Sequence, residues 1–132
     1  MTRLLDTNIC IYYLNQSSEK LAANFKKYSP SEIKLSSITV AELFYGAEKS
    51  KAKKKNTVTV ERFTTTFEIL PFDDACSRIY ANVRASLEKS GTSIGPMDLL
   101  IASISLAHNL VLVTNNTKEF RRVKNLKLEN WL

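Results

Sequence analysis

Short apolar runs alternate with amphipathic stretches along the whole chain. Apolar runs bounded by polar or turn residues predict buried strands, and apolar residues at helical spacing predict helices. Strands are expected at residues 3–6, 33–37, 68–70, 110–113 and, as an edge strand, 126–128. Helices are expected at residues 9–14, 20–28, 39–50, 73–89 and 96–108, with one more between the lysine-rich run at 49–55 and the strand at 68–70.

The order of these elements indicates an α/β fold, because strands that alternate with helices build a parallel sheet. The 132 residues contain no internal repeat, low-complexity segment or domain boundary. We therefore expect residues 1–132 to form one domain, which is long enough to bury a core. The large apolar helix residues expected to face that core are Tyr12, Tyr13, Phe44, Tyr45, Val58, Phe63 and Phe67.

The charge balance of the chain indicates a class of binding partner. The chain has 19 Lys and Arg residues against 13 Asp and Glu residues, a net charge of +6 and a pI of about 9.4. Excess positive charge is typical of proteins that meet polyanions, although a protein can be basic without binding nucleic acid. Lys53, Lys54 and Lys55 lie in the lysine-rich run, which is either a solvated connector or a track for a phosphate backbone.

Several function classes find no support in the sequence. His108 is the only histidine, and its place at a helix end favours a capping role over nucleophilic catalysis. No glycine-rich phosphate loop occurs, which disfavours an NTPase or a dinucleotide enzyme. Cys10 and Cys76 form neither a disulfide framework nor a metal-ligand cluster, and both are expected in the core of a protein in a reducing compartment. With no signal peptide or membrane-spanning stretch, a cytoplasmic location is expected.

Three acidic residues lie at positions where a carboxylate is unusual, beside a strand end or within an apolar helix. Asp6 follows the first expected strand, Glu42 lies in a helix that is apolar around most of its circumference, and Asp98 opens a helix that is apolar nearly all round. In open α/β sheets, ligands bind outside the carboxyl ends of the strands. Carboxylates gathered at that edge would suit a hard divalent cation, because such cations take oxygen ligands.

Each of these acids also has a purely structural interpretation. Asp6 can cap the first helix, Glu42 can lie on a solvated stripe with Thr39 and Gly46, and Asp98 can improve a helix start through the helix dipole. For Asp6 the two interpretations are equally good, and the helical pattern does not reject the stripe for Glu42. A helix-start role gives no reason to surround Asp98 with apolar residues, so a ligand role is favoured there.

A fourth polar group follows the strand expected at residues 110–113. Asn115 and Asn116 come first, and Glu119 lies one turn further on. Because this strand should end beside the first one, Asn116 could orient a water or a metal ligand, and Glu119 could supply another carboxylate. An ordinary asparagine-rich turn explains the segment equally well.

Four fragments carry a family likeness. They are Leu5-Asp6-Thr7-Asn8-Ile9, residues 40–47 around Glu42, Gly95-Pro96-Met97-Asp98 with Ile101-Ala102, and residues 112–116 with Glu119-Phe120. In this order and spacing they make the chain resemble a PIN-domain ribonuclease of the VapC toxin type over essentially its whole length. The resemblance implies a five-stranded, mostly parallel sheet flanked by helices, with an acidic pocket that binds Mg²⁺ or Mn²⁺.

The resemblance also assigns expected roles within that pocket. Asp6, Glu42 and Asp98 match the three core acids of the family. Asp6 and Asp98 would ligate the metal, and Glu42 would ligate it or position the attacking water. Many relatives carry Asp where Asn116 stands, and Glu119 is the candidate substitute for that fourth acid.

An activity and partners follow from the same resemblance. Proteins of this type look like site-specific endoribonuclease toxins that often cut tRNA anticodon loops. They are silenced by a cognate VapB-type antitoxin and usually dimerise. The candidates for holding the RNA backbone are Lys53, Lys54, Lys55, Arg121, Arg122 and Lys124.

Two other functions remain to be separated from this one. A PIN-like domain that has lost catalysis and acts only through RNA or protein contacts is consistent with Asn116, although the three retained acids disfavour it. A phosphatase or receiver domain with Asp6 as phospho-acceptor explains the first strand. It leaves the apolar surroundings of Glu42 and Asp98 unexplained.

Overall fold

A five-stranded sheet runs through the centre of the computed structural model, which describes residues 1–132. The strands are β1 (Arg3–Leu5), β2 (Ile33–Ser36), β3 (Glu68–Leu70), β4 (Val111–Val113) and β5 (Lys127–Glu129), in the order β3-β2-β1-β4-β5. All neighbouring pairs are parallel. Leu5 pairs with Val113, so β1 and β4 end side by side, as the sequence predicted.

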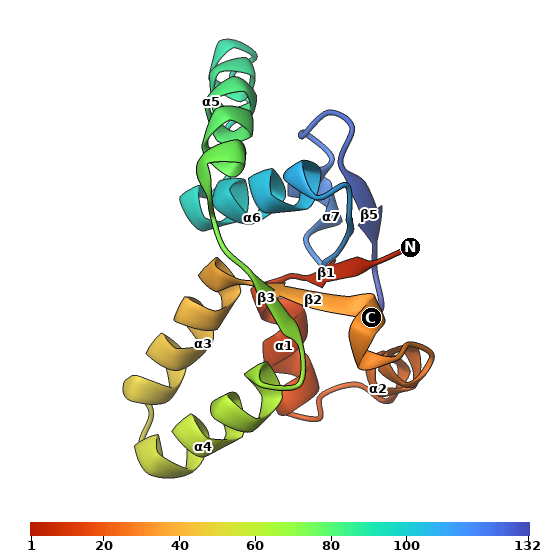
Figure 1. Cartoon of the computed structure of the whole chain (residues 1–132), viewed down its shortest axis with the longest axis vertical. Coiled ribbons are helices and arrows are strands. Elements are labelled where there is room, and N and C mark those ends of the chain that lie inside the picture. Colours follow the sequence, from red (N-terminus) through yellow and green to blue (C-terminus); the bar gives the residue numbers. More distant parts are fainter.

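Seven α-helices and one 3-10 helix connect the strands. They are α1 (Thr7–Leu14), α2 (Glu19–Lys26), η1 (Pro30–Glu32), α3 (Ser37–Glu48), α4 (Lys53–Thr64), α5 (Asp74–Lys89), α6 (Pro96–Ala107) and α7 (Thr117–Phe120). In Figure 1, α1 to α4 lie on one side of the sheet, and α5, α6 and α7 lie on the other. Every predicted strand and helix is present with small shifts of its ends. The single turns η1 and α7 were not predicted, because one turn is too short to show a period.

The strands separate two hydrophobic cores, because successive side chains of a strand point to opposite faces. Leu5 and Val113 pack with residues of α1 to α4, whereas Leu4 and Leu112 pack with residues of α5, α6 and α7. Cys10 is buried in the first core and Cys76 in the second, as expected. The molecule is thus a three-layer α/β/α domain, which confirms the predicted fold class.

Helix α6 is the buried helix of the second core, and both of its ends are fixed. Pro96 occupies the first helical position. At the other end His108 is the C-cap, and Asn109 has a positive φ of 53°. The amides of Asn109 and Leu110 donate to the carbonyl oxygens of Leu106 and Ser105, at 3.2 and 2.9 Å, which is the Schellman arrangement. Neither α6 nor any other helix is long and apolar enough to cross a membrane.

The lysine-rich run is only partly a connector. Helix α3 ends at Glu48 and α4 begins at Lys53, so Lys53, Lys54 and Lys55 form the first turn of α4. The connector is restricted to residues 49–52. The helix start was missed because Ala52 stands at the N-cap position, where it makes no side-chain cap, so the usual Ser, Thr, Asp or Asn signal is absent.

Three of the apolar residues expected in the core are exposed instead. The exposed fractions of Tyr12, Tyr45 and Val58 are 36%, 65% and 44%. The core face of α4 carries Val60 and Phe63, which lie one turn apart. Val58 and Phe63 have i, i+5 spacing and therefore do not share a helix face, so the prediction for Val58 was wrong.

The two valines of α4 provide a matched test of this packing. We expect Val60→Ala to lower the free energy of unfolding by about 1–2 kcal/mol, because it removes buried methyl groups. Val58→Ala has the same effect on helix propensity and should change stability by less than about 0.5 kcal/mol. Urea denaturation of both variants measures the difference. Equal losses in the two would show that Val60 does not pack in the core.

Candidate active site

Asp6 follows β1 directly and is 3% exposed. It occupies the N-cap position of α1, yet its side chain makes no capping hydrogen bond. Instead its Oδ2 accepts a hydrogen bond of 2.7 Å from the hydroxyl of Thr114, which follows the neighbouring strand β4. Burial raises the pKa of Asp6, hydrogen bonds from Thr114 and the Thr7 amide lower it, and the charge of Glu42 raises it. The capping interpretation therefore fails for this side chain.

Glu42 reaches the same edge of the sheet from α3. Its Oε1 accepts a hydrogen bond of 2.6 Å from the hydroxyl of Thr7, the residue after Asp6. The hydroxyl oxygen of Thr7 also lies 3.0 Å from that of the fully buried Thr39. Because the Thr7 proton goes to Glu42, Thr39 donates to Thr7. Glu42 is therefore held by a chain of two hydroxyls and does not lie on a solvated stripe.

Asp98 lies in the first turn of α6 and is half-buried. Its surroundings are less apolar than the sequence suggested, since Met97 is 49% exposed. The pKa of Asp98 is raised from 3.8 to about 6, first by burial and then by the charges of Asp6, Glu119 and Glu42. Because the charges of Asp6, Glu119 and Glu42 act on Asp98, the four carboxylates lie near one another.

Glu119 comes from the short helix α7 and is held by two amides. Its Oε1 accepts a hydrogen bond of 2.8 Å from the backbone N–H of Gly95, and its Oε2 accepts one of 2.9 Å from Asn116 Nδ2. These bonds lower the pKa of Glu119. A Cβ on Gly95 would lie 3.4 Å from Asp98 Oδ2 and 3.9 Å from Glu119 Oε1, which places both acids against the same glycine. Asn116 thus orients a carboxylate.

The ligand atoms of this cluster are oxygens, which suits a divalent cation of the hard class. No three of the four carboxylates have oxygens all within 4.8 Å of one another. That spacing is compatible with a cation that keeps several water ligands and binds protein through few carboxylates. The residues present therefore fit a divalent metal.

The predicted RNA-binding lysines are placed unequally around the acids. Lys55 and Glu42 line the same hollow of about 380 Å³ between α1, α3 and α4. Lys53 is exposed and pairs with Glu48 at 2.6 Å. Lys54 is exposed. Of this group, Lys55 is the residue that the structure places in a hollow with one of the four carboxylates.

The predicted arginines lie beyond α7. Arg122 donates a hydrogen bond of 2.9 Å to the carbonyl oxygen of Ser93, and its charge helps to lower the pKa of Glu119. Arg121 is exposed and, with Lys124, lines a different hollow between α7 and β5. The structure therefore brings Arg122 toward the acids and leaves Arg121 on the outer surface.

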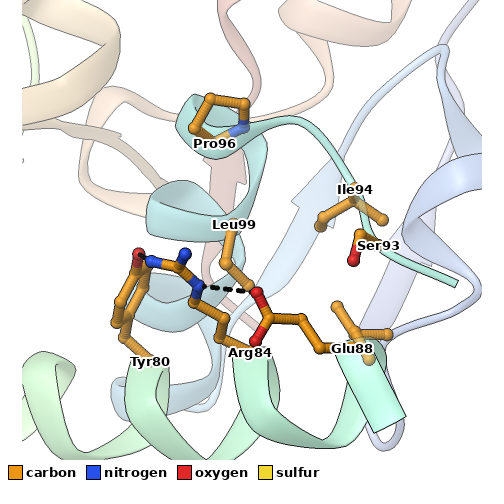
Figure 2. Close-up of a pocket in the computed structure, with 8 residues that line it drawn as sticks. Tyr80, Arg84, Glu88, Ser93, Ile94, Pro96 and Leu99 are labelled. Atoms are coloured by element: carbon orange, nitrogen blue, oxygen red, sulfur yellow. Dashed lines mark hydrogen bonds and ion pairs between the residues drawn. The ribbon is translucent and has the colours of Figure 1, made fainter. Parts of the chain in front are cut away.

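Figure 2 shows a further hollow, of about 220 Å³, between α5 and the segment that leads into α6. Arg84 in its wall donates hydrogen bonds to the Tyr80 hydroxyl at 2.9 Å and to Glu88 Oε2 at 3.2 Å. Pro96 and Leu99 also line it. None of the four clustered carboxylates lines this hollow, and its arginine is already paired. It is separate from the acidic cluster.

The groups that fix the acids were not identified from the sequence. Thr7, Thr39 and Thr114 supply hydroxyls, and Gly95 supplies a backbone amide. Threonine in a helix or after a strand is too common to suggest such a role. The only available signal was position, because Thr7 and Thr114 each stand next to a predicted strand end.

Comparison with known proteins gives a consistent result. The pattern of the PIN domain family matches residues 3–126. The chain is 45% identical over 132 residues to "Ribonuclease VapC2" of Rickettsia felis, covering 99% of this chain and 98% of the relative. It is 39% identical over 128 residues to the "tRNA(fMet)-specific endonuclease VapC" of Salmonella typhimurium, covering 97% and 96%.

Solved structures show the same similarity in three dimensions. The chain matches a structure of VapBC2 from Rickettsia felis bound to a promoter DNA fragment with a TM-score of 0.91 and 43% identity, covering 100% of both chains. It matches a structure of DNA-bound VapBC from Salmonella typhimurium with a TM-score of 0.94 and 38% identity, covering 100% of this chain and 99% of the other. The whole fold, with five parallel strands, is thus shared.

The clustered acids predict a dependence of stability on pH. The pKa of Asp98 is about 6 in the folded protein, against 3.8 for an unperturbed aspartate. The stability that protonation of Asp98 contributes is complete below the lower value and is lost as the pH rises through the higher one. In chelator at pH 8, Asp98→Asn should therefore be more stable than the wild type by about 1 kcal/mol, after a discount for solvent screening.

Thermal melting of both proteins in chelator at pH 8 and pH 4 measures this effect. The variant should melt about 3 °C higher at pH 8. The difference should largely disappear at pH 4, where the wild-type carboxyl is protonated in the folded state. A difference of the same size at both pH values would show that Asp98 does not experience the other charges.

Proposed function

The chain belongs to the PIN-domain family, as a VapC-type ribonuclease, and from this premise we propose that it is a Mg²⁺- or Mn²⁺-dependent toxin of a toxin–antitoxin pair that cuts tRNA. The observation that carries the proposal is Asp98, whose pKa is raised to about 6 by burial and by three neighbouring carboxylates. Like charges kept together at one sheet edge weaken the fold, and functional sites are where such clusters are retained.

Each carboxylate has a proposed task. A bound divalent cation lowers the pKa of a water molecule and neutralises charge on the scissile phosphate. Asp6 and Asp98 are proposed to ligate it, and Glu42 to ligate it or to position the attacking water. Glu119, oriented by Asn116, supplies the fourth carboxylate.

Fixed hydroxyls support these tasks. The Thr114 hydroxyl holds Asp6 at 2.7 Å, and the Thr7 hydroxyl holds Glu42 at 2.6 Å. A carboxylate that is oriented before substrate arrives loses less freedom in the transition state. The threonines therefore act as positioning residues for a phosphodiester hydrolase.

We take tRNA as the substrate because relatives that align with nearly the whole chain are named tRNA(fMet)-specific endonucleases. The net charge of +6 is consistent with a polyanionic substrate. Cleavage in the anticodon loop is the expected position. A direct experiment is to incubate the protein with purified initiator and elongator tRNA and to sequence the ends of any fragments.

A VapB-type antitoxin is the proposed protein partner, since the matched structures are VapBC complexes. Ile11, Tyr12 and Val58 are exposed apolar residues of α1 and α4, the helices that border the hollow at Glu42. Exposed apolar side chains around a functional hollow are typical of a protein-binding surface. A homodimer and a cytoplasmic location stay predictions.

The alternative of an inactive PIN-like domain rested on Asn116 in place of an acid. Because Asn116 Nδ2 donates to Glu119 at 2.9 Å, a fourth carboxylate is available without an acid at that position. The alternative loses its main support. A phosphatase or receiver domain is disfavoured by the family match and by the hydrogen bond between Thr7 and Glu42.

Removing one carboxylate should abolish cleavage. We expect Asp6→Asn, Glu42→Gln and Asp98→Asn each to reduce the rate of tRNA cleavage at least about 100-fold, because one cation and one water depend on all of them. The Asp6→Asn/Asp98→Asn double variant should lose no more than either single variant, since residues that act as a unit fail together. Cleavage assays at saturating Mg²⁺ measure these rates.

Asp74→Asn is the matched control, because it makes the same acid-to-amide change at an exposed position of α5, where Asp74 pairs only with Arg78. Its cleavage rate should equal that of the wild type. A folded Asp98→Asn protein that retains full activity would refute the proposed mechanism.

The lysines of α4 should contribute to RNA binding through phosphate contacts. In an Asp98→Asn background, replacing Lys53, Lys54 and Lys55 with Gln should flatten the dependence of log Kd on log salt by about 0.7 for each lysine that touches a phosphate. Binding of labelled tRNA over a salt series gives this slope. Replacing Lys20, Lys26 and Lys27 on the α2 side with Gln removes the same charge and is the control. Equal slopes for both triple variants would show that the α4 lysines do not contact the RNA.

A further inference from the structure

Three side chains with different ligand chemistry meet away from the acidic cluster. The ligand atoms of Asp73, Cys76 and His108 all lie within 4.8 Å of one another. Asp73 and Cys76 belong to the start of α5, and His108 ends α6. His108 is the only histidine of the chain. Residues far apart in sequence thus bring a carboxylate, a thiol and an imidazole together.

Regular capping geometry fixes each member of this cluster. Asp73 is the N-cap of α5, and its Oδ1 accepts a hydrogen bond of 3.1 Å from the amide of Cys76. The same carboxylate also interacts with the Cys76 thiol, which lies beside it. His108 is held at the end of α6 by the Schellman hydrogen bonds of the two residues that follow it. The backbone positions of the three ligands are therefore set before any ion binds.

The Cys76 thiol has only weak partners in the protein. It is fully buried, its Sγ lies 3.9 Å from the Pro71 carbonyl oxygen, and it also interacts with the Asp73 carboxylate. Burial raises the pKa of this thiol. Asp73 and His108 are exposed and their ligand atoms lie within 4.8 Å of the buried sulfur, so an ion would approach from their side and reach the sulfur as these two side chains move apart. A thiolate at the start of a helix is favoured by the helix dipole, and a cation at the end of α6 is favoured by the opposite end of its dipole.

We propose that Asp73, Cys76 and His108 form a second metal site that binds one Zn²⁺ ion, with water as the fourth ligand. Thiolate, imidazole and carboxylate are the ligands that tetrahedral zinc takes in proteins, at about 2.0–2.3 Å. Binding replaces the thiol proton with the metal, so one proton is released to solvent for each ion bound. Glu68 lies close enough for His108 to affect its pKa, but it pairs with Lys34 at 2.6 Å and is not a ligand.

This site differs from the acidic cluster in both place and chemistry. Asp98 and His108 are ten residues apart on α6, or about 15 Å along a helix. The acidic cluster offers oxygen ligands and suits a hard cation, whereas sulfur and nitrogen ligands select zinc. Zinc at the second site would tie the start of α5 to the end of α6, and so it should stabilise the fold without taking part in RNA cleavage.

The experiment uses the full-length Asp98→Asn protein, in which the acidic cluster is weakened, and adds Co²⁺ as a coloured substitute for Zn²⁺. We expect one equivalent of Co²⁺ to produce a thiolate-to-metal charge-transfer band that excess Mg²⁺ does not remove and that Zn²⁺ abolishes by displacement. His108→Gln and Asp73→Asn change exposed side chains that the core does not need. His108→Gln should weaken Co²⁺ binding at least about tenfold, and Asp73→Asn should weaken it less.

Cys76→Ser should lose the band entirely, whereas Cys10→Ala should keep it, because Cys10 lies in the other core. Equimolar Zn²⁺ should raise the melting temperature of the starting protein and leave that of His108→Gln unchanged. Absence of the band, its survival in Cys76→Ser, or equal stabilisation of both proteins by Zn²⁺ would overturn the proposal. Because none of these readouts is RNA cleavage, failure here would leave the proposed nuclease activity intact.

Discussion

Repulsion among four carboxylates constrains the carboxyl edge of this sheet. Asp6, Glu42, Asp98 and Glu119 come from different elements, and the pKa of Asp98 is raised first by burial and then by the charges of the other three. Carboxylates that repel one another would separate into water if their supporting elements allowed it. They stay together because β1 is the central strand and α6 is buried, so the backbone positions are set by packing on both sides of the sheet.

Neutral hydrogen-bond donors orient these acids, and a neutral donor leaves the negative charge of a carboxylate intact. The salt bridges of the protein join Arg3 to Glu129 and four other surface or rim pairs, and none includes any of the four clustered acids. An arginine partner would neutralise part of the negative charge that attracts a metal ion. A threonine hydroxyl or a backbone amide orients a carboxylate oxygen and leaves its net charge available. The repulsion among these carboxylates, which no cationic side chain offsets, is therefore what allows the site to bind a cation.

Helix α6 connects the acidic cluster with the proposed zinc site. Its first turn carries Asp98 and its C-cap is His108, while most of the residues between them are buried. Because the helix is rigid and enclosed, a ligand at one end can stabilise the helix without moving the other. This separation explains how one short domain could hold two ions of different character.

The order of apolar and polar residues by itself determined the α/β class, the parallel sheet and the position of Asp6 at a strand end. It also singled out Glu42 and Asp98, because a carboxylate within an apolar helix is unusual in any fold. The single-turn helices, the true start of α4 and the exposure of Tyr45 and Val58 were not recoverable, since these depend on local caps and on which face a neighbour covers.

Only the tertiary structure decided which groups act together. Thr114 meets Asp6 across 108 positions of sequence, and His108 meets Cys76 across 32 positions, since 108 minus 76 is 32. A sequence pattern reports the environment that each residue requires, because burial and periodicity are local properties. The choice of partner depends on how strands and helices are ordered in space. For this reason the acids could be predicted, but the hydroxyls that orient them and the second ligand cluster could not.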